Sequence, residues 1–113
     1  MEIQLAAKRL SALAQEGRLA VFRLLVEAGP EGMAAGEIAQ KLGLPPNTLS
    51  AQLAILANAG LAGSRRAGRS IIYSVNYDGM NRLLAYLTEE CCQGKPELCA
   101  PPGRTAITCS PPK

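Results

Sequence analysis

The hydrophobic pattern of the first thirty residues predicts two helices. Apolar residues recur at helical spacing in a first segment that ends near Ala14, namely Ile3, Ala6, Ala7, Leu10 and Leu13. A second helix is expected from about Gly17 until Gly29-Pro30 stops it. Apolar residues cover most of its circumference, among them Leu19, Val21, Phe22, Leu24, Leu25 and Val26. We therefore predict that the second helix forms the centre of the core.

Two shorter helical segments follow, separated by a tight turn. Residues 35–42 carry apolar side chains on one face, and Gly43 is a typical stop for that helix. Pro46 suits the first turn of the next helix, because its missing N–H would have no partner there. That helix is predicted to run from Pro46 to Asn58, before Gly60. Two short helices joined in this way form a helix-turn-helix.

The remaining pattern predicts a hairpin, a last helix and a tail. Residues 61–66 and 70–75 have extended character around the turn at Ala67-Gly68. A final helix is expected from about Asp78 until Gly94 and Pro96 end it, with an apolar stripe of Met80, Leu83, Leu84, Leu87 and Cys91. Residues 1–94 are thus predicted to form one mainly helical domain with a β-hairpin. Residues 95–113, rich in proline and containing cysteine, are predicted to form a flexible tail.

Composition limits the class of protein. A chain of 113 residues suffices for a single core, which must be mainly aliphatic because only 4% of the residues are aromatic. No apolar run approaches the roughly 20 residues that span a bilayer, and the N-terminus lacks the layout of a secretion signal. We therefore expect a cytosolic protein with no membrane contact. In a reducing cytosol, four cysteines indicate ligands or redox groups more than structural disulfides.

The predicted order of elements is that of a winged helix-turn-helix domain. The stretch Gly36–Ser50, followed by Leu53, Leu56, Ala59-Gly60-Leu61 and Gly68-Arg69-Ser70-Ile71-Ile72-Tyr73, resembles the arsenical-responsive repressors of the ArsR/SmtB family. The resemblance covers most of residues 1–92. It implies a homodimer in which the first and last helices pair across a two-fold axis, so that two helix-turn-helix units face successive major grooves of double-stranded operator DNA.

The apolar stripes of the first and last helices favour a dimer independently of the resemblance. A domain of this size has little core left to cover both stripes, and a second copy of the chain would hide the excess apolar surface. The alternative is that both stripes pack against the second helix of the same chain.

Candidate DNA contacts lie on the second helix of the helix-turn-helix and on the hairpin. If Leu49, Leu53 and Leu56 face inward, the opposite side is small and mostly polar. Gln52 is the best candidate for reading a base, because its amide can bond adenine through two hydrogen bonds. The family commonly has histidine at this position and lysine in place of Ala54, so an operator preference does not carry over. The predicted contacts are Asn47, Thr48, Ser50, Gln52, Arg65, Arg66 and Arg69.

Two less specific interpretations apply to these residues. Asn47 and Thr48 stand near a helix start, where such residues often only cap the helix. The three arginines of the hairpin could form an ordinary solvated face, although no acidic residue accompanies them.

A cysteine cluster at the end of the last helix is the candidate sensor. The chain contains no histidine, so a site built from Cys91, Cys92 and Cys99 favours soft ions that bind sulfur. Adjacent helical residues project about 100° apart, so the last turn must loosen for Cys91 and Cys92 to share one ion. Three thiolates suit trivalent arsenic or antimony better than zinc, which usually takes four ligands. Cys109 is the doubtful fourth member.

The resemblance and the cysteine cluster together predict a repressor that binds operator DNA as a dimer and is released when As(III) or Sb(III) binds Cys91, Cys92 and Cys99. No cofactor is expected to be required for DNA binding, and no enzymatic activity is expected, since a Cys-x-x-Cys arrangement and a parallel sheet are both missing from the pattern. The alternatives are a thiol redox repressor, a cadmium, lead or zinc site that includes Cys109, and a mere packing role for Cys91.

Overall fold

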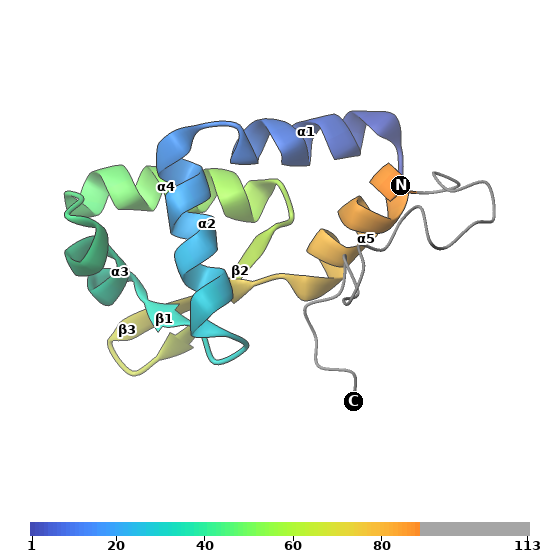
Figure 1. Cartoon of the computed structure of the whole chain (residues 1–113). Helices are drawn as coiled ribbons and strands as arrows, with labels where there is room; N and C mark the ends of the chain where they lie inside the picture. The colour runs from blue at the N-terminus through green and yellow to red at the C-terminus, as the bar shows by residue number, and fades with distance from the viewer. Residues whose placement is uncertain (89–113) are drawn as a thin grey trace, which may run out of the picture.

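The computed structural model describes residues 1–88 of the chain. The elements follow in the order α1 (Ile3–Leu13), α2 (Glu16–Ala28), β1 (Met33–Ala34), α3 (Ala35–Leu42), α4 (Pro46–Asn58), β2 (Ala62–Ala67), β3 (Ser70–Val75) and α5 (Tyr77–Thr88) (Figure 1). The predicted domain boundary at residue 94 and the predicted tail, residues 95–113, lie outside the described residues.

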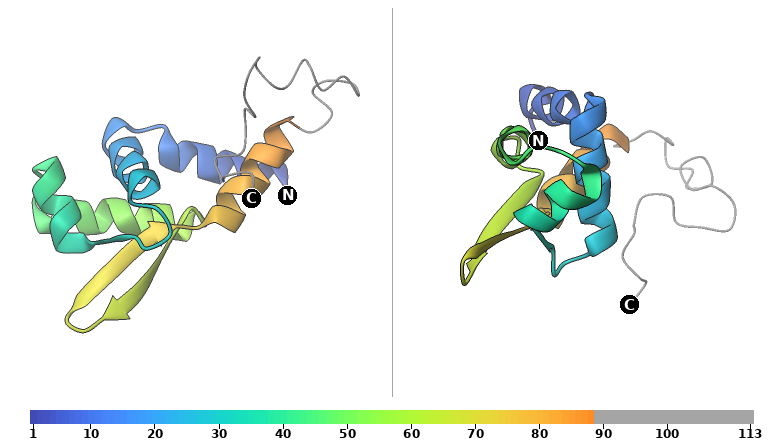
Figure 2. Two further views of the ribbon diagram at one scale, coloured as in Figure 1. Left: turned by 60° about the horizontal axis from the view of Figure 1, so that its bottom comes forward. Right: turned by 90° about the vertical axis from the view of Figure 1, so that its left-hand side faces the viewer.

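The predicted helix-turn-helix and hairpin are confirmed. α3 ends at Gly43, whose φ of +66° is the left-handed conformation that glycine adopts without strain, and α4 begins with Pro46. β2 and β3 pair antiparallel from Ala62↔Val75 to Ala67↔Ser70. Figure 2 shows this hairpin projecting from the helices, as the wing of a winged-helix domain does.

One strand was missed. The sequence pattern places Met33 in a loop, whereas Met33–Ala34 forms β1 and pairs antiparallel with β3 through Met33↔Tyr73 and Ala34↔Ile72. The sheet order is β1-β3-β2. A strand of two residues has no alternation to detect, and its partner lies far away in the sequence.

The core lies between α2, the helix-turn-helix and the base of the hairpin. Its fully buried members include Val21, Leu25, Ile38, Leu49, Leu53, Leu56 and Leu61. α2 contributes Val21, Phe22 and Leu25, which confirms it as a core helix, but Leu19 at its start is 44% exposed. Among residues 1–88, no helix is long and apolar enough to cross a membrane.

Candidate nucleic-acid interface

The orientation of α4 is fixed by its buried side. Leu49, Leu53 and Leu56 are all at most 2% exposed and belong to the core, as does Ile38 of α3. The turn between the two helices closes through the hydrogen bond from Leu44 N to Ala39 O, 3.0 Å long. Because the buried side is set by the core, the opposite side of α4 must face outward.

The outward side of α4 is small and uncharged. Asn47, Thr48, Ser50 and Ala51 are exposed, and Ile55 is 41% exposed. The N-cap of α4 is Pro45, with no side-chain capping bond, so the structure gives Asn47 and Thr48 no capping role. No charged residue occurs between Pro46 and Asn58. This side therefore offers polar groups and methyl groups to a groove, without any charge.

Gln52 lies apart from the outward side. It is half-buried, and its Nε2 donates to Oε1 of Gln15 across 3.4 Å. Gln15 is the N-cap of α2, and its Oε1 also accepts a 2.8 Å hydrogen bond from the backbone N–H of Arg18. A 3.4 Å bond is long for an N–H donor, so the amide of Gln52 can exchange it for another partner at little cost.

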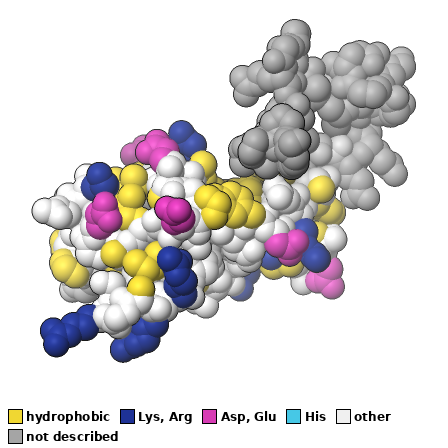
Figure 3. Space-filling view, turned by 90° about the horizontal axis from the view of Figure 1, so that it is seen from below, with side chains coloured by type: hydrophobic (Ala, Val, Ile, Leu, Met, Phe, Trp, Pro, Cys, Tyr) yellow, Lys and Arg dark blue, Asp and Glu magenta, His cyan; other side chains and the backbone are white. Residues whose placement is uncertain are grey.

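The three predicted arginines of the wing are in different situations. Arg65 extends towards the loop before β1, where its Nη2 donates to the carbonyl oxygen of Glu31 across 3.2 Å. Arg66 and Arg69 are exposed and make no side-chain hydrogen bond or ion pair with any residue in the described part of the chain. In Figure 3, basic side chains gather at the lower left, at the end of the wing, with no acidic side chain among them. This end of the molecule is suited to phosphate contacts.

Replacing Arg66 and Arg69 together with alanine is expected to weaken binding to every DNA sequence by a similar factor. Each phosphate contact made by arginine releases counterions from the DNA, so losing a contact lowers the slope of log affinity against log salt by about 1. The slope should therefore decrease by about 2 for each bound copy of the chain, or about 4 for a dimer. The measurement is a salt titration of DNA affinity by fluorescence anisotropy. Arg23→Ala is the control, because Arg23 is an exposed arginine of α2 that pairs with Glu27 at 3.8 Å. An unchanged slope for the double variant would exclude wing-phosphate contacts.

A second exposed surface is apolar and lies on α1 and α5, which sit side by side away from the wing (Figures 1 and 2). Ile3 and Leu10 of α1 are 71% and 42% exposed, and Leu87 of α5 is 47% exposed. Within the single chain, α1 buries Ala6 and Ala12, and α5 buries Leu83. The alternative in which both stripes are covered by the chain's own α2 is therefore wrong for Ile3, Leu10 and Leu87.

The predicted sulfur ligands Cys91, Cys92 and Cys99 lie outside the described residues, as does Cys109. Residues 1–88 contain no group of three or more His, Cys, Asp or Glu side chains placed to hold a metal ion. α5 reaches Thr88, shortly before Cys91 in the sequence.

The hydrophobic pattern also missed a buried charged residue. Arg9 of α1 is 9% exposed and is the one buried charged side chain of residues 1–88. Its signal in the sequence is its position between Ala6 and Ala12, on the face that α1 turns to the rest of the domain. That face is distinct from the one that carries Ile3 and Leu10.

Comparisons with known proteins agree with this architecture. A helix-turn-helix domain model matches residues 13–62. The nodulation protein NolR of Rhizobium meliloti is 35% identical over 78% of this chain and 70% of its own length. The HTH-type transcriptional regulator YgaV of Escherichia coli is 32% identical over 77% of this chain and 86% of its own.

Among solved structures, a homodimeric winged helix-turn-helix DNA-binding domain from Mycobacterium bovis is similar. It comes from a possible ArsR-family transcriptional regulator and was determined in solution. The match has a TM-score of 0.64 and 30% identity, and it covers 76% of this chain and 77% of that one.

Proposed function

This chain belongs to the ArsR family of winged-helix transcriptional regulators, and from that premise we propose that it is a repressor that As(III) or Sb(III) releases from operator DNA. The observation that carries the DNA-binding part of the proposal is an exposed, uncharged outward side of α4 together with arginines at the end of the neighbouring wing. Amides, hydroxyls and methyl groups such as those of α4 can contact base edges, and arginines such as those of the wing can bind phosphates. Both kinds of contact are thus available to one duplex.

The proposed DNA-binding unit is a homodimer joined through α1 and α5. The single chain exposes the apolar side chains of Ile3, Leu10 and Leu87 to water. A two-fold interface would bury them, because it places the same patch of each copy against the other. The similar domain from M. bovis is homodimeric. Two copies of α4 would then address two half-sites of a palindromic operator.

The proposed inducer site consists of the thiolates of Cys91, Cys92 and Cys99. It is supported by the absence of histidine from the whole chain and by the preference of soft ions for sulfur. The three cysteines follow α5 closely in the sequence, and α5 is part of the proposed dimer surface. Sulfur–metalloid bonds formed there would act on the helix whose position sets the separation of the two α4 helices.

Release then follows from the different affinities of the inducer for two arrangements of the dimer. The arrangement that fits the operator is favoured without inducer, and the sulfur-bound arrangement separates the reading helices from their half-sites. A ligand shifts such an equilibrium only by its differential affinity. A typical coupling of about 1–3 kcal/mol lowers operator affinity by about 5- to 150-fold.

The test is a release assay on a labelled operator selected by the protein from random duplexes. Under full reduction, arsenite or antimonite should lower the fluorescence anisotropy of the bound operator. Release that requires an oxidant and ignores arsenite would instead support a redox repressor. Release by cadmium, lead or zinc that is lost in Cys109→Ser would support a four-sulfur site. A complex that no ion or oxidant dissociates would contradict the proposal.

A further inference from the structure

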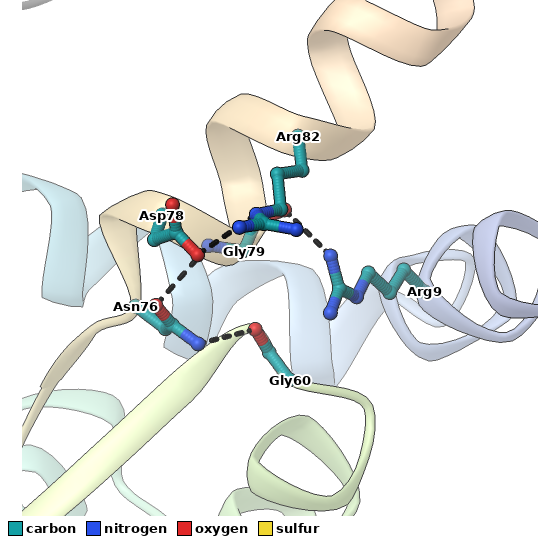
Figure 4. A network of polar contacts seen from close by, with 6 residues as sticks. All are labelled: Arg9, Gly60, Asn76, Asp78, Gly79 and Arg82. Carbon is teal, nitrogen blue, oxygen red and sulfur yellow. Dashed lines mark hydrogen bonds and ion pairs between the residues drawn. The ribbon is translucent and has the colours of Figure 1, made fainter. Parts of the chain in front are cut away.

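The buried arginine of α1, Arg9, joins the end of α4 to the start of α5. We call α4 the reading helix, because it is the helix proposed to contact base edges. Arg9 Nε donates to the carbonyl oxygen of Ala59, and Arg9 Nη1 donates to that of Gly79, each across 2.8 Å. Ala59 is the C-cap of α4, and Gly79 lies in the first turn of α5. Figure 4 shows Arg9 reaching from α1 towards Gly79 and Gly60. One guanidinium therefore bridges the two helices.

Two glycines and an asparagine make this junction tight. A side chain at Gly60, whose φ is +83°, would place its Cβ 2.6 Å from Nη2 of Arg9. A Cβ at Gly79 would overlap the carbonyl oxygen of Gly60. Asn76 donates through Nδ2 to that same oxygen, 2.9 Å away, and accepts through Oδ1 from Gly79 N at 3.1 Å (Figure 4). The start of α5 is thus packed closely against the backbone of Gly60, which follows the C-cap of α4.

The charge of Arg9 makes the two hydrogen bonds costly to break. Within residues 1–88 it forms no ion pair, and nearby Asp78 pairs with Arg82 at 3.0 Å instead. The carbonyl end of α4 is the negative end of the helix dipole and stabilises the buried cation. Losing either carbonyl would leave a charged donor unsatisfied in a buried position, a far larger penalty than losing an exposed bond.

We propose that Arg9 is a positioning residue that couples α5 to the reading helix α4, so that a displacement of α5 is transmitted to α4. When α5 shifts, Arg9 either carries the C-terminal end of α4 along or gives up a buried hydrogen bond. The inference rests on the proposed function, because coupling to DNA has a use only if α4 binds it. Coupling between two sites is reciprocal, so DNA bound at α4 must also change the conformational stability of α5.

Amide hydrogen exchange of the full-length chain, with and without the selected operator, tests this coupling. In the wild type, operator binding is expected to slow exchange of the α5 amides by about tenfold. In Arg9→Met, which keeps an unbranched chain but has no donor, the ratio should fall to about one. Arg18→Met is the control, since Arg18 Nε also donates to a carbonyl, Ala12 O at 2.7 Å, but joins only α1 and α2. It should retain the wild-type ratio. A merely structural role would change stability in both variants without removing the ratio selectively in one.

The outcomes separate this inference from the proposed function. Full operator-dependent slowing in Arg9→Met, or none in the wild type, would overturn the coupling. If the wild type bound no operator, the proposed function would fail, and the coupling would be tested by amide exchange in the DNA-free proteins. In that comparison, Arg9→Met should accelerate exchange both at the end of α4 and at the start of α5. Unchanged exchange would overturn the coupling. If Arg9→Met does not fold, Arg9→Lys, which keeps the charge but reaches one carbonyl at a time, takes its place.

Discussion

Serine in place of Cys91, Cys92 and Cys99 together is expected to leave operator affinity unchanged and to abolish release by arsenite. A hydroxyl is a poor ligand for a soft ion, whereas the helix-turn-helix and the wing lie elsewhere in the chain. Arsenite should lower the operator affinity of the wild type by about 5- to 150-fold and that of the variant not at all. The measurement is the operator dissociation constant by anisotropy, with and without arsenite, under reduction.

The control for this prediction is Cys109→Ser, which removes the fourth cysteine and should retain the full arsenite response. Arsenite release that persists in the triple variant would refute the sulfur site. Direct metalloid binding by the purified proteins, measured by mass spectrometry under native conditions, provides a second readout. We expect the wild type to bind one metalloid per chain and the triple variant to bind none.

Leu10→Glu is expected to convert the dimer into monomers and to reduce operator affinity by at least about 100-fold, because the second half-site is then no longer bound by a linked partner. Leu10 is 42% exposed in the single chain, so the substitution should cost the protomer little stability. In the dimer it would bury a carboxylate in an apolar interface, which is strongly unfavourable. Sedimentation velocity gives the assembly state, and thermal unfolding monitored by circular dichroism reports whether each protomer still folds.

The matched control for assembly is Ile71→Glu. Ile71 is 39% exposed, close to the value for Leu10, but it lies on β3 in the wing. This variant should sediment as a dimer. A dimeric Leu10→Glu protein would show that α1 is not the site of pairing. A monomeric Ile71→Glu protein would show that the loss of pairing is not specific to α1.

Periodicity predicted those elements whose own residues carry the signal. α3 and α4 begin and end at the predicted residues, because Gly43 and Pro46 mark their ends and apolar residues fill one side of each. β1 could not be found in this way, since two residues show no period and the strand exists only through its pairing with β3. Pairing between distant segments is a property of the tertiary structure.

The candidate site was predicted in its general placement but not in its detail. The prediction that the side of α4 away from its buried leucines is exposed is correct for Asn47, Thr48 and Ser50. The contact of Gln52 with Gln15 was not predicted, because it depends on how the N-terminus of α2 approaches α4. Arg9 was missed for a similar reason. Hydrophobic periodicity treats every charged residue as solvent-facing. The guanidinium of Arg9 is instead buried and donates hydrogen bonds to two backbone carbonyls from other parts of the chain.

Because α4 has no charged residue, DNA affinity and sequence specificity are expected to depend on different parts of this protein. All three basic residues proposed to contact DNA lie on the wing, and α4, the helix proposed to enter the groove, has no charged residue. Added salt competes with contacts to phosphates but hardly with neutral contacts to bases. Moderate ionic strength should therefore shorten the residence of this protein on all DNA while preserving the preference for its own operator over random sequence.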